Sequence, residues 1–377
     1  MLKNFKIDLR LIKEIDKTVL ISTVLLVLYG ILNVYMCTKG NYGFYFAKQQ
    51  FFWFVLSIIA LYFFVAIDYT IIFNYVPIFY WGSVILLLAA KIPGIGVVVN
   101  GARGWIRVGG FQLQPAELAK LGIILMLAKK LDEMDGEIND IKNFFILVIY
   151  ALIPVVFIVT QPDMGMTMVC FFIVLGIFYI AGLDMKIIGG GLLSLVLLIV
   201  IVWNSGLIQS YQKQRFTAFL NPEAADATSG YHLTQSLIGI GSGGILGSKP
   251  SLKIDGTTGY AAQNVPEVQT DFIFAAIAEQ WGLIGAIALL TLYGFLIYKM
   301  ISIARTSKDI FGSIICVGII SYFLFAIFQN IGMTIGLLPI TGITLPLISY
   351  GGSSLLTTIM SIALVLNIGM RRKKIHF

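Results

Sequence analysis

Ten apolar runs recur along this chain of 377 residues, and they restrict its fold more than any other feature of the sequence. A run of about 17–25 apolar residues is long enough to cross a bilayer as an α-helix. We therefore expect an all-α polytopic membrane protein with about ten transmembrane helices, built as a single integral-membrane domain over residues 1–377. The predicted spans are Thr18–Met36, Phe51–Ala66, Ile72–Ala90, Leu118–Ala128, Phe144–Thr160, Met164–Ala181, Ile187–Trp203, Phe272–Tyr298, Phe311–Ile335 and Leu345–Gly369.

The composition excludes a large soluble domain. Hydrophobic residues make up 58% of the chain and charged residues 12%, and the mean hydropathy is +0.91. These values are typical of polytopic membrane proteins. The fourth predicted span is long enough only if residues 114–130 are helical throughout, and the third span carries Pro77.

The lysines and arginines predict the orientation in the membrane, because cytoplasmic loops carry an excess of them. With the N-terminus inside, both termini are predicted to be cytoplasmic, and the outer loops hold fewer cations over longer stretches. This asymmetry accounts for the net charge of +7, so no nucleic-acid partner is needed to explain it. The cytoplasmic cations are then Lys3, Lys6, Arg10, Lys13, Lys17, Lys129, Lys130, Lys142, Lys186, Lys299, Arg305, Lys308, Arg371, Arg372, Lys373 and Lys374.

Cysteine and histidine offer little for metal or triad chemistry. Cys37, Cys170 and Cys316 fall in or beside apolar spans. This placement predicts small hydrophobic core residues, not a disulfide framework or a metal cluster. The chain has two histidines, His232 and His376, so zinc chemistry and a Ser-His-Asp triad are poorly supported. Any metal would be a hard cation held by carboxylates and substrate phosphates.

The second outer loop, residues 92–117, is rich in glycine and places Trp105 between Arg103 and Arg107. Glycine lets the backbone approach another surface closely. The loop therefore predicts either a binding element or an interfacial aromatic anchor with snorkelling arginines.

A helix is predicted to open just beyond this loop, because Pro115 suits a first-turn position. Glu117 and Lys120 are three residues apart on one helical face, so they can neutralise each other in the membrane. Such a buried pair serves either structure or function. Asp163, in the turn after the fifth span, is a candidate cap for the next helix.

The largest outer loop, residues 205–269, lies between the seventh and eighth helices. A structureless loop of this length is unusual, so we expect it to contain helices that pack over the bundle. Gly239 to Gly244 match the G-x-G-x-x-G pattern, but no strand precedes them and no βαβ unit surrounds them, which excludes a dinucleotide site. The run remains either an anion-holding turn or a flexible re-entrant turn.

Asp271 follows this loop at the entrance of a long apolar run. A carboxylate at a membrane helix mouth is either functional or a cap for the helix, with Thr270 as N-cap. Glu279 lies about two turns further on much the same face, which suggests a cavity lined by two carboxylates. Prolines, glycines and hydroxyls in residues 336–354 predict broken backbone at membrane depth, which is tolerated where it lines a cavity or is buried in protein.

These blocks together resemble the SEDS family of polytopic cell-wall glycosyltransferases, typified by RodA, FtsW and SpoVE. The matching stretches occur in order over most of the chain: GARGWI, FQLQPAELAK, QPDMG, GYHLTQSLIGIGSGGILG, VPEVQTDFIFAAIAE and GLLPITGITLPLISYGGSS. The short ends outside the first and last spans look most RodA-like.

The resemblance implies an enzyme of the bacterial cytoplasmic membrane that polymerises lipid II into glycan strands on the outer face, for cell elongation and shape. A class B penicillin-binding protein that cross-links the product is the implied partner. Asp271 matches the essential carboxylate of the family. Trp105, Glu117, Lys120 and Ser353 lie in the other matching blocks and are carried over as substrate-site candidates.

The sequence departs from the family's pattern in three places. Gly104 stands where relatives often have a basic residue, Gln269 where they often have His, and Ser248 and Lys249 where they often have Lys-Gly. These departures weaken the assignment of a cation next to Trp105. Lys249, one position after the family's usual lysine, is the candidate substitute.

Glycosyl transfer with inversion needs a base for the acceptor hydroxyl and positive charge for the departing pyrophosphate. We expect Asp271 to be the base, with Arg103, Arg215 and Lys249 around the diphosphate. A divalent cation, Mg²⁺ or Mn²⁺, is a candidate cofactor, and no organic cofactor is expected. Three alternatives stay open: a lipid II flippase, a non-catalytic scaffold, and a family member specific to division or sporulation.

Overall fold

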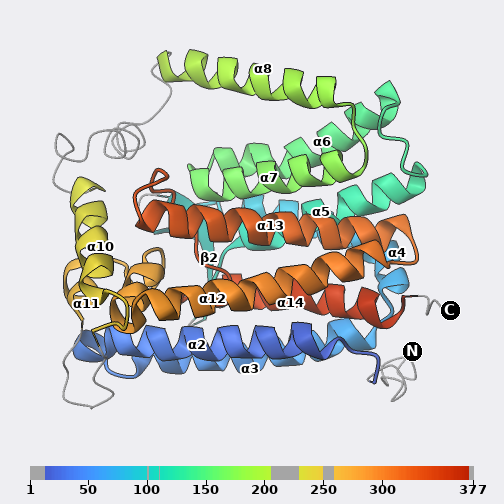
Figure 1. Ribbon diagram of the computed structural model, residues 1–377. Helices are drawn as coiled ribbons and strands as arrows, with labels where there is room; N and C mark the ends of the chain where they lie inside the picture. Colours follow the sequence, from blue (N-terminus) through green and yellow to red (C-terminus); the bar gives the residue numbers. More distant parts are fainter. Residues whose placement is uncertain (1–12, 100–101, 110, 205–228, 249–258, 373–377) are drawn as a thin grey trace.

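The computed structural model describes residues 13–99, 102–109, 111–204, 229–248 and 259–372, and these residues form a bundle of roughly parallel helices with one small sheet (Figure 1). Figure 1 also places the start of the first bundle helix and the end of the last at one end of the bundle. The helices are α2 (Lys17–Tyr42), α3 (Tyr45–Ala66), α4 (Tyr69–Ala89), α5 (Pro115–Glu133), α6 (Ile141–Val159), α7 (Met164–Ile180), α8 (Met185–Asn204), α10 (Ser229–Gly243), α11 (Tyr260–Asn264), α12 (Ile273–Arg305), α13 (Ile310–Thr334) and α14 (Gly352–Met370). The strands are β1 (Gly96–Val99), β2 (Ala102–Val108) and β3 (Phe111–Leu113).

Aspartates set the start of five of the bundle helices. In each, the carboxylate accepts a hydrogen bond from a backbone N–H in the first turn, which satisfies a donor that the helix itself cannot pair. This confirms the prediction that Asp163 caps the sixth span, since its Oδ1 accepts from the N–H of Met166 at 2.9 Å. The capping residues are Asp16, Asp68, Asp140, Asp163 and Asp309.

Each of the ten predicted spans coincides with a helix of the described chain. Seven helices are long and apolar enough to cross a membrane, namely α2, α3, α4, α6, α12, α13 and α14. The other three predicted spans are α7, α8 and α5. The apolar stretches of α7 and α8 are shorter, and α5 carries more charged residues. The fourth span is continuous, because α5 runs unbroken from Pro115 to Glu133, and α4 passes through Pro77.

The predicted start of the tenth span was wrong. We expected a helix from Leu345, but α14 begins at Gly352, and residues 335–351 form an irregular connection between α13 and α14. Leu347 has a φ of 69° and Gly342 a φ of 75°, which a continuing helix does not allow. The broken backbone that the prolines and glycines predicted therefore begins before α14 and replaces its first two turns.

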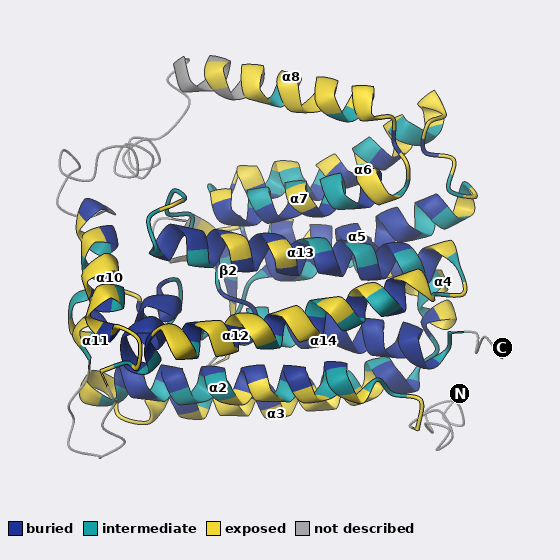
Figure 2. Cartoon of the chain, in the orientation of Figure 1, coloured by how far each residue is buried: buried dark blue, intermediate teal, exposed yellow. Residues whose placement is uncertain are grey.

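The core lies between the central helices α5, α13 and α14, while most of α8 is exposed at the edge (Figure 2). Among the seven apolar spans, α13 and α14 are the most buried. Their neighbours are α7 and α12 for α13, and α3 for α14. Most side chains on these two helices are therefore enclosed by protein rather than by lipid.

The glycine-rich second outer loop forms a three-stranded antiparallel sheet in the order β1-β2-β3. Trp105 pairs with Val97 of β1, and Arg107 pairs with Gln112 of β3. The sequence predicted a loop that approaches another surface but did not predict strands. The sheet contacts α5 through β2 and α14 through β3.

The described part of the large outer loop contains α10 and α11, as expected for a loop that packs over the bundle. Figure 1 shows α10 lying across one end of the bundle, at the start of α12. It is tied to α13 by the Ser236 hydroxyl, which donates to the carbonyl of Thr334 at 2.8 Å.

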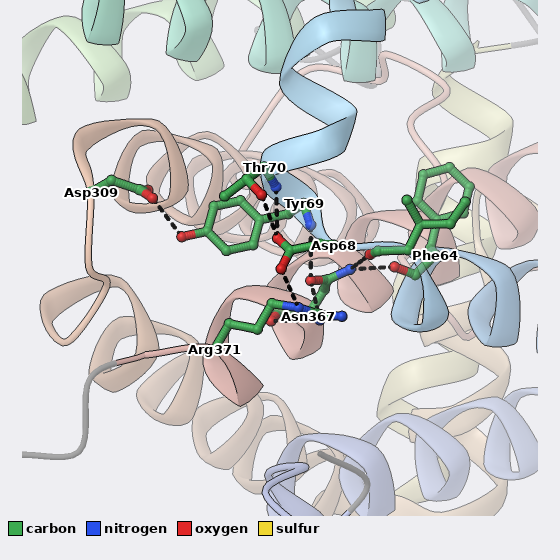
Figure 3. A network of polar contacts seen from close by, with 8 residues as sticks. Phe64, Asp68, Tyr69, Thr70, Asp309, Asn367 and Arg371 are labelled. Carbon is green, nitrogen blue, oxygen red and sulfur yellow. Dashed lines mark hydrogen bonds and ion pairs between the residues drawn. The ribbon is translucent and has the colours of Figure 1, made fainter. Parts of the chain in front are cut away.

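The opposite end of the bundle is closed by a polar network around Asp68 (Figure 3). Arg371 Nε lies 3.0 Å from Asp68 Oδ2, and the Tyr69 hydroxyl donates to Asp309 at 2.6 Å. Burial alone would raise the pKa of Asp68, but hydrogen bonds from Thr70 and the positive charges of Arg371 and Lys308 hold it below its ordinary value. The network joins α4, α13 and α14.

Candidate active site

The candidate site is built at the end of the bundle where the sheet, the starts of α5, α12 and α14, and the 335–351 segment meet. Trp105 and Arg107 share one face of β2, because alternate residues of a strand point to the same side. The register shifts at Gly104, so Trp105 pairs with Val97 whereas Arg103 pairs with Val98, the next residue of β1, and the alternation does not extend to Arg103. The Arg103 side chain is exposed and Trp105 is half-buried.

Ser353 links the sheet to the starts of α5 and α14. Its hydroxyl accepts from the backbone N–H of Gln114 and donates to the carbonyl of Gln112, both at 3.1 Å. The side-chain amide of Gln114 in turn donates to the Asp163 carboxylate at 3.1 Å. Ser353 is buried in these contacts, so it links the starts of α5 and α14.

Glu117 and Lys120 form the predicted ion pair, with Lys120 Nζ 2.7 Å from Glu117 Oε2. The two side chains are 5% and 1% exposed, so the pair is fully enclosed. Thr357 of α14 donates to the same carboxylate at 2.8 Å, and the Lys120 ammonium lies 3.5 Å from the centre of the Tyr322 ring. Because a buried ion pair needs further partners to offset its desolvation, these contacts explain how α5 tolerates two charges.

Asp271 is half-buried in a turn that precedes α12. The helix begins at Ile273 with Phe272 as its N-cap, so neither Asp271 nor Thr270 occupies the capping position that the sequence left open. Phe272 is buried and anchors the turn. The Asp271 carboxylate is therefore carried by a turn that the buried Phe272 side chain fixes to the protein.

Three consecutive carbonyls of this turn are bound. The carbonyl of Gln269 accepts from the N–H of Tyr350 at 2.8 Å, and that of Thr270 accepts from the Ser349 hydroxyl at 2.6 Å. The carbonyl of Asp271 accepts from the side-chain amide of Asn330 at 2.8 Å. Since two of these donors lie in the 335–351 segment, the broken backbone after α13 supports the turn that carries Asp271.

The 335–351 segment is itself held by polar side chains from three helices. Gln50 of α3 donates to the Ser349 carbonyl at 3.0 Å, and Gln329 of α13 donates to the Pro339 carbonyl at 2.9 Å. The Tyr293 hydroxyl of α12 donates to the carbonyl of Pro346 at 2.5 Å. These bonds meet the requirement that irregular backbone at membrane depth be satisfied within the protein.

The prediction that Asp271 and Glu279 line one cavity was wrong. Glu279 is buried and accepts from the backbone N–H groups of Tyr260 and Ala261, at the start of α11. The two carboxylates therefore belong to different structures, because Asp271 lies before α12 and Glu279 binds the loop that packs on it.

The glycine run from Gly239 to Gly244 likewise does not form an open anion-holding turn. It ends α10 and packs on the break in α12 at Gly282, where a Cβ on Gly243 would lie 2.1 Å from the carbonyl oxygen of Ala278. The N–H of Ser248 donates to the carbonyl of Glu279 at 2.9 Å. The glycines here serve close packing of backbone on backbone.

Two predicted site residues, Arg215 and Lys249, lie outside the described residues. Gly104, which departs from the family's basic residue, is buried against Gln161: a Cβ there would lie 3.1 Å from the Gln161 amide oxygen. Gln161 is itself fixed by a bond to the Leu87 carbonyl at 2.9 Å. A larger side chain at position 104 would have to displace it.

The described residues do not form a protein-held metal site. No group of three or more His, Cys, Asp or Glu side chains lies close enough together among them to hold an ion. Divalent cations of this kind take six or more oxygen ligands, so substrate phosphates would have to supply most of them.

The sequence interpretation missed three side chains that hold the site, Asn330, Thr357 and Tyr322, and also Gln329, which binds Pro339 near the start of the 335–351 segment and not the Asp271 turn. Gln329 and Asn330 are adjacent amides within an apolar span and are almost fully buried. A polar pair inside a membrane helix indicates side chains that form hydrogen bonds within the protein. The sequence could therefore have predicted this role for Gln329 and Asn330. Thr357 and Tyr322 carry no comparable signal, because hydroxyls are common in membrane helices.

Comparison with known proteins gives consistent relatives. The cell cycle protein family of FtsW, RodA and SpoVE matches residues 14–374. Stage V sporulation protein E of Bacillus subtilis is 35% identical over 94% of this chain and 96% of its own length. The probable peptidoglycan glycosyltransferase FtsW of Geobacter metallireducens is 33% identical over 98% of each chain, and the peptidoglycan glycosyltransferase MrdB of Escherichia coli is 31% identical over 96% and 95%.

The fold is similar to that of a chain in a solved peptidoglycan synthase complex, with a TM-score of 0.81, 28% identity, and coverage of 96% of this chain and 99% of the other. Sequence and fold agree along almost the whole chain. The protein belongs to the SEDS family of polytopic cell cycle proteins, together with FtsW, RodA and SpoVE.

Proposed function

We propose that this protein is a peptidoglycan glycosyltransferase that polymerises lipid II on the outer face of the bacterial cytoplasmic membrane. Both termini are then cytoplasmic, and the end of the bundle that carries Asp271 faces outward. The observation that supports this most directly is the Asp271 turn, whose three consecutive carbonyls are bound by buried side chains and by the 335–351 segment. A carboxylate on so firmly held a turn suits a general base, which needs a fixed position relative to its substrate.

In the proposed step, Asp271 removes the proton from the acceptor sugar hydroxyl. The oxygen attacks the anomeric carbon of the donor, a C–O bond forms, and the bond from that carbon to the lipid diphosphate breaks. The electron pair of that bond leaves with the diphosphate, and the proton stays on the Asp271 carboxylate until solvent accepts it. The exposed Arg103 of β2, with Arg215 and Lys249, is proposed to neutralise the departing charge.

The Glu117–Lys120 pair has a different proposed role. It is buried and already neutralised, so it does not suit a direct contact with a charged substrate. We assign it to orientation of the site, because Thr357 on the same carboxylate lies one turn from Ser353, which contacts the sheet.

The proposal includes a partner and a cellular role. A class B penicillin-binding protein would cross-link the glycan product, which accords with the likeness to a chain of a peptidoglycan synthase complex. We propose the RodA-type role in cell elongation. The identities of 35%, 33% and 31% to SpoVE, FtsW and MrdB lie too close together to separate the subtypes, so the test is depletion in the native bacterium. Rounding of the cells supports elongation, whereas filaments would indicate division.

The activity is tested with purified wild-type and Asp271→Ala protein, each with its candidate partner carrying an inactive transpeptidase, and with labelled lipid II. Glycan chains are read on a gel, with and without EDTA. Polymer from wild type and none from an equally folded Asp271→Ala protein is the expected result. Near-normal polymer from Asp271→Ala would refute the base assignment, and lipid II crossing vesicles without polymer would favour the flippase.

A further inference from the structure

Asn330 of α13 is fully buried, and its side-chain amide binds two separate segments of the chain. Nδ2 donates to the carbonyl of Asp271 at 2.8 Å and to the carbonyl of Ile343 at 2.7 Å. These acceptors lie 59 and 13 residues away in the sequence. One rigid side chain on a central helix thus joins the turn that carries the carboxylate to the broken segment beside it.

The orientation of this amide is fixed by its contacts. Turning it over would bring Oδ1 against two carbonyl oxygens, which repel it. In the orientation observed, Oδ1 is buried with no hydrogen-bond partner among the described residues. Because an unsatisfied buried acceptor is costly, an apolar residue would suit this position better if packing were its only purpose. The two donated bonds are therefore what the asparagine supplies.

The segment on the other side of Asn330 contacts the carboxylate itself. Gly342, which precedes Ile343, has a φ of 75°, and a Cβ placed on it would lie 3.3 Å from Asp271 Oδ2. The backbone of Gly342 therefore lies directly beside the carboxylate. Since Asn330 binds the carbonyls of both Asp271 and Ile343, it sets the position of the carboxylate relative to this backbone.

We infer that Asn330 is a positioning residue for glycosyl transfer, which holds the Asp271 carboxylate in place by binding the carbonyls of Asp271 and Ile343. The inference rests on the proposed function. Asn330 does not touch substrate. Its effect falls on the rate of the chemical step, because a displacement of about 1 Å at a reacting group can lower a rate about 100-fold.

The neighbouring residue offers a matched control. Gln329 is also buried on α13 and also binds the 335–351 segment, but its amide donates to Pro339 instead. Asn330→Asp and Gln329→Glu both replace an amide with a carboxyl group of the same shape. A buried carboxyl group protonates and then has one donor, so Gln329→Glu keeps its single bond whereas Asn330→Asp can keep only one of two.

The experiment measures kcat and KM for lipid II polymerisation by wild type, Asn330→Asp, Gln329→Glu and Asp271→Ala, each with the same partner protein. Folded protein is quantified by size exclusion and thermal melting, and rates are given per folded molecule. We expect kcat of Asn330→Asp to fall at least about 10-fold with KM changed less than about 2-fold, since only the reacting group has moved. Gln329→Glu should stay within about 2-fold of wild type in both constants.

Equal kcat values for Asn330→Asp and Gln329→Glu would overturn the inference, as would a loss confined to KM or accounted for by unfolded protein. If Asn330→Asp does not fold, Asn330→Ser and Gln329→Ser are compared by the same criteria. Absence of polymer from wild type, or full activity of Asp271→Ala, would overturn the proposed function and this inference with it. If Asn330→Asp keeps the kcat of wild type while Asp271→Ala is inactive, the inference about Asn330 is overturned and the proposed function stands.

Discussion

Removing both partners of the Glu117–Lys120 pair should destabilise the protein by less than the sum of the two single removals. Lys120→Met leaves the Glu117 carboxylate buried without its counter-ion and removes the cation from the Tyr322 ring. Breaking a buried pair in this way costs about 3–5 kcal/mol. Glu117→Gln keeps an oxygen that can accept from Thr357 and Lys120, so we expect a smaller loss of about 1–3 kcal/mol.

The double variant Glu117→Gln/Lys120→Met contains no buried charge at either position. Its loss of unfolding free energy should therefore be smaller than the sum of the two single losses by about 2 kcal/mol or more. The measurement is unfolding by SDS in mixed micelles, followed by tryptophan fluorescence. Lys130→Met is the control, because Lys130 forms a more exposed pair with Glu133 on the same helix and should cost about 1 kcal/mol or less.

Additive losses, with a coupling below about 0.5 kcal/mol, would refute the reasoning, because they would mean that the two charges do not stabilise each other. The exchange variant Glu117→Lys/Lys120→Glu separates stability from function. It restores a pair but places a carboxylate over the Tyr322 ring, so we expect polymerisation above that of either single exchange and below wild type. No recovery would count against the orientation role.

Two further perturbations test other parts of the fold. Because the folded-state pKa of Asp68 is lowered, its contribution to stability is present above its unfolded pKa and is lost as pH falls through the folded pKa. The difference in unfolding free energy between wild type and Asp68→Asn should therefore be constant near pH 7 and shrink below about pH 4, and a difference independent of pH would contradict the network in Figure 3. Gly282→Ala should cost about 3 kcal/mol or more, since Gly282 has a φ of 64° and its Cβ would lie 2.4 Å from the backbone nitrogen of Gly247. Gly294→Ala in the same helix, where a Cβ meets nothing within 4 Å, should be neutral or stabilising, and equal losses for both would contradict the close packing at Gly282.

The membrane helices could be predicted from the sequence because each is a local feature. Hydrophobic length set the spans, and a short polar residue such as Asp163 marked a helix start within three residues of the N–H that it binds. The Glu117–Lys120 pair was predictable for the same reason, since both residues lie on one helical turn.

The rest depended on contacts between distant segments. The bond from Asn330 to Asp271 spans 59 residues, and that from Gln50 to Ser349 spans 299, so no local pattern indicates either. Glu279 was misread because helical periodicity was extended through Asp271, which lies in a turn. The three strands were missed because glycines, which favour turns, interrupt the β-formers on both sides of Trp105 in that loop.

The two halves of the candidate site share one element. Ser349 binds the Asp271 turn, and Ser353, four residues later, binds the sheet and the start of α5. The hydroxyls of Thr344 and Ser354 lie 3.1 Å apart and close the segment between them on itself. A displacement of the start of α14 would therefore reach both the Asp271 turn, through Ser349, and the Glu117–Lys120 pair, through Thr357. This is the physical basis of the orientation role proposed for the ion pair: its carboxylate accepts from Thr357, one turn beyond Ser353, and so fixes the helix start next to the segment that holds the Asp271 turn.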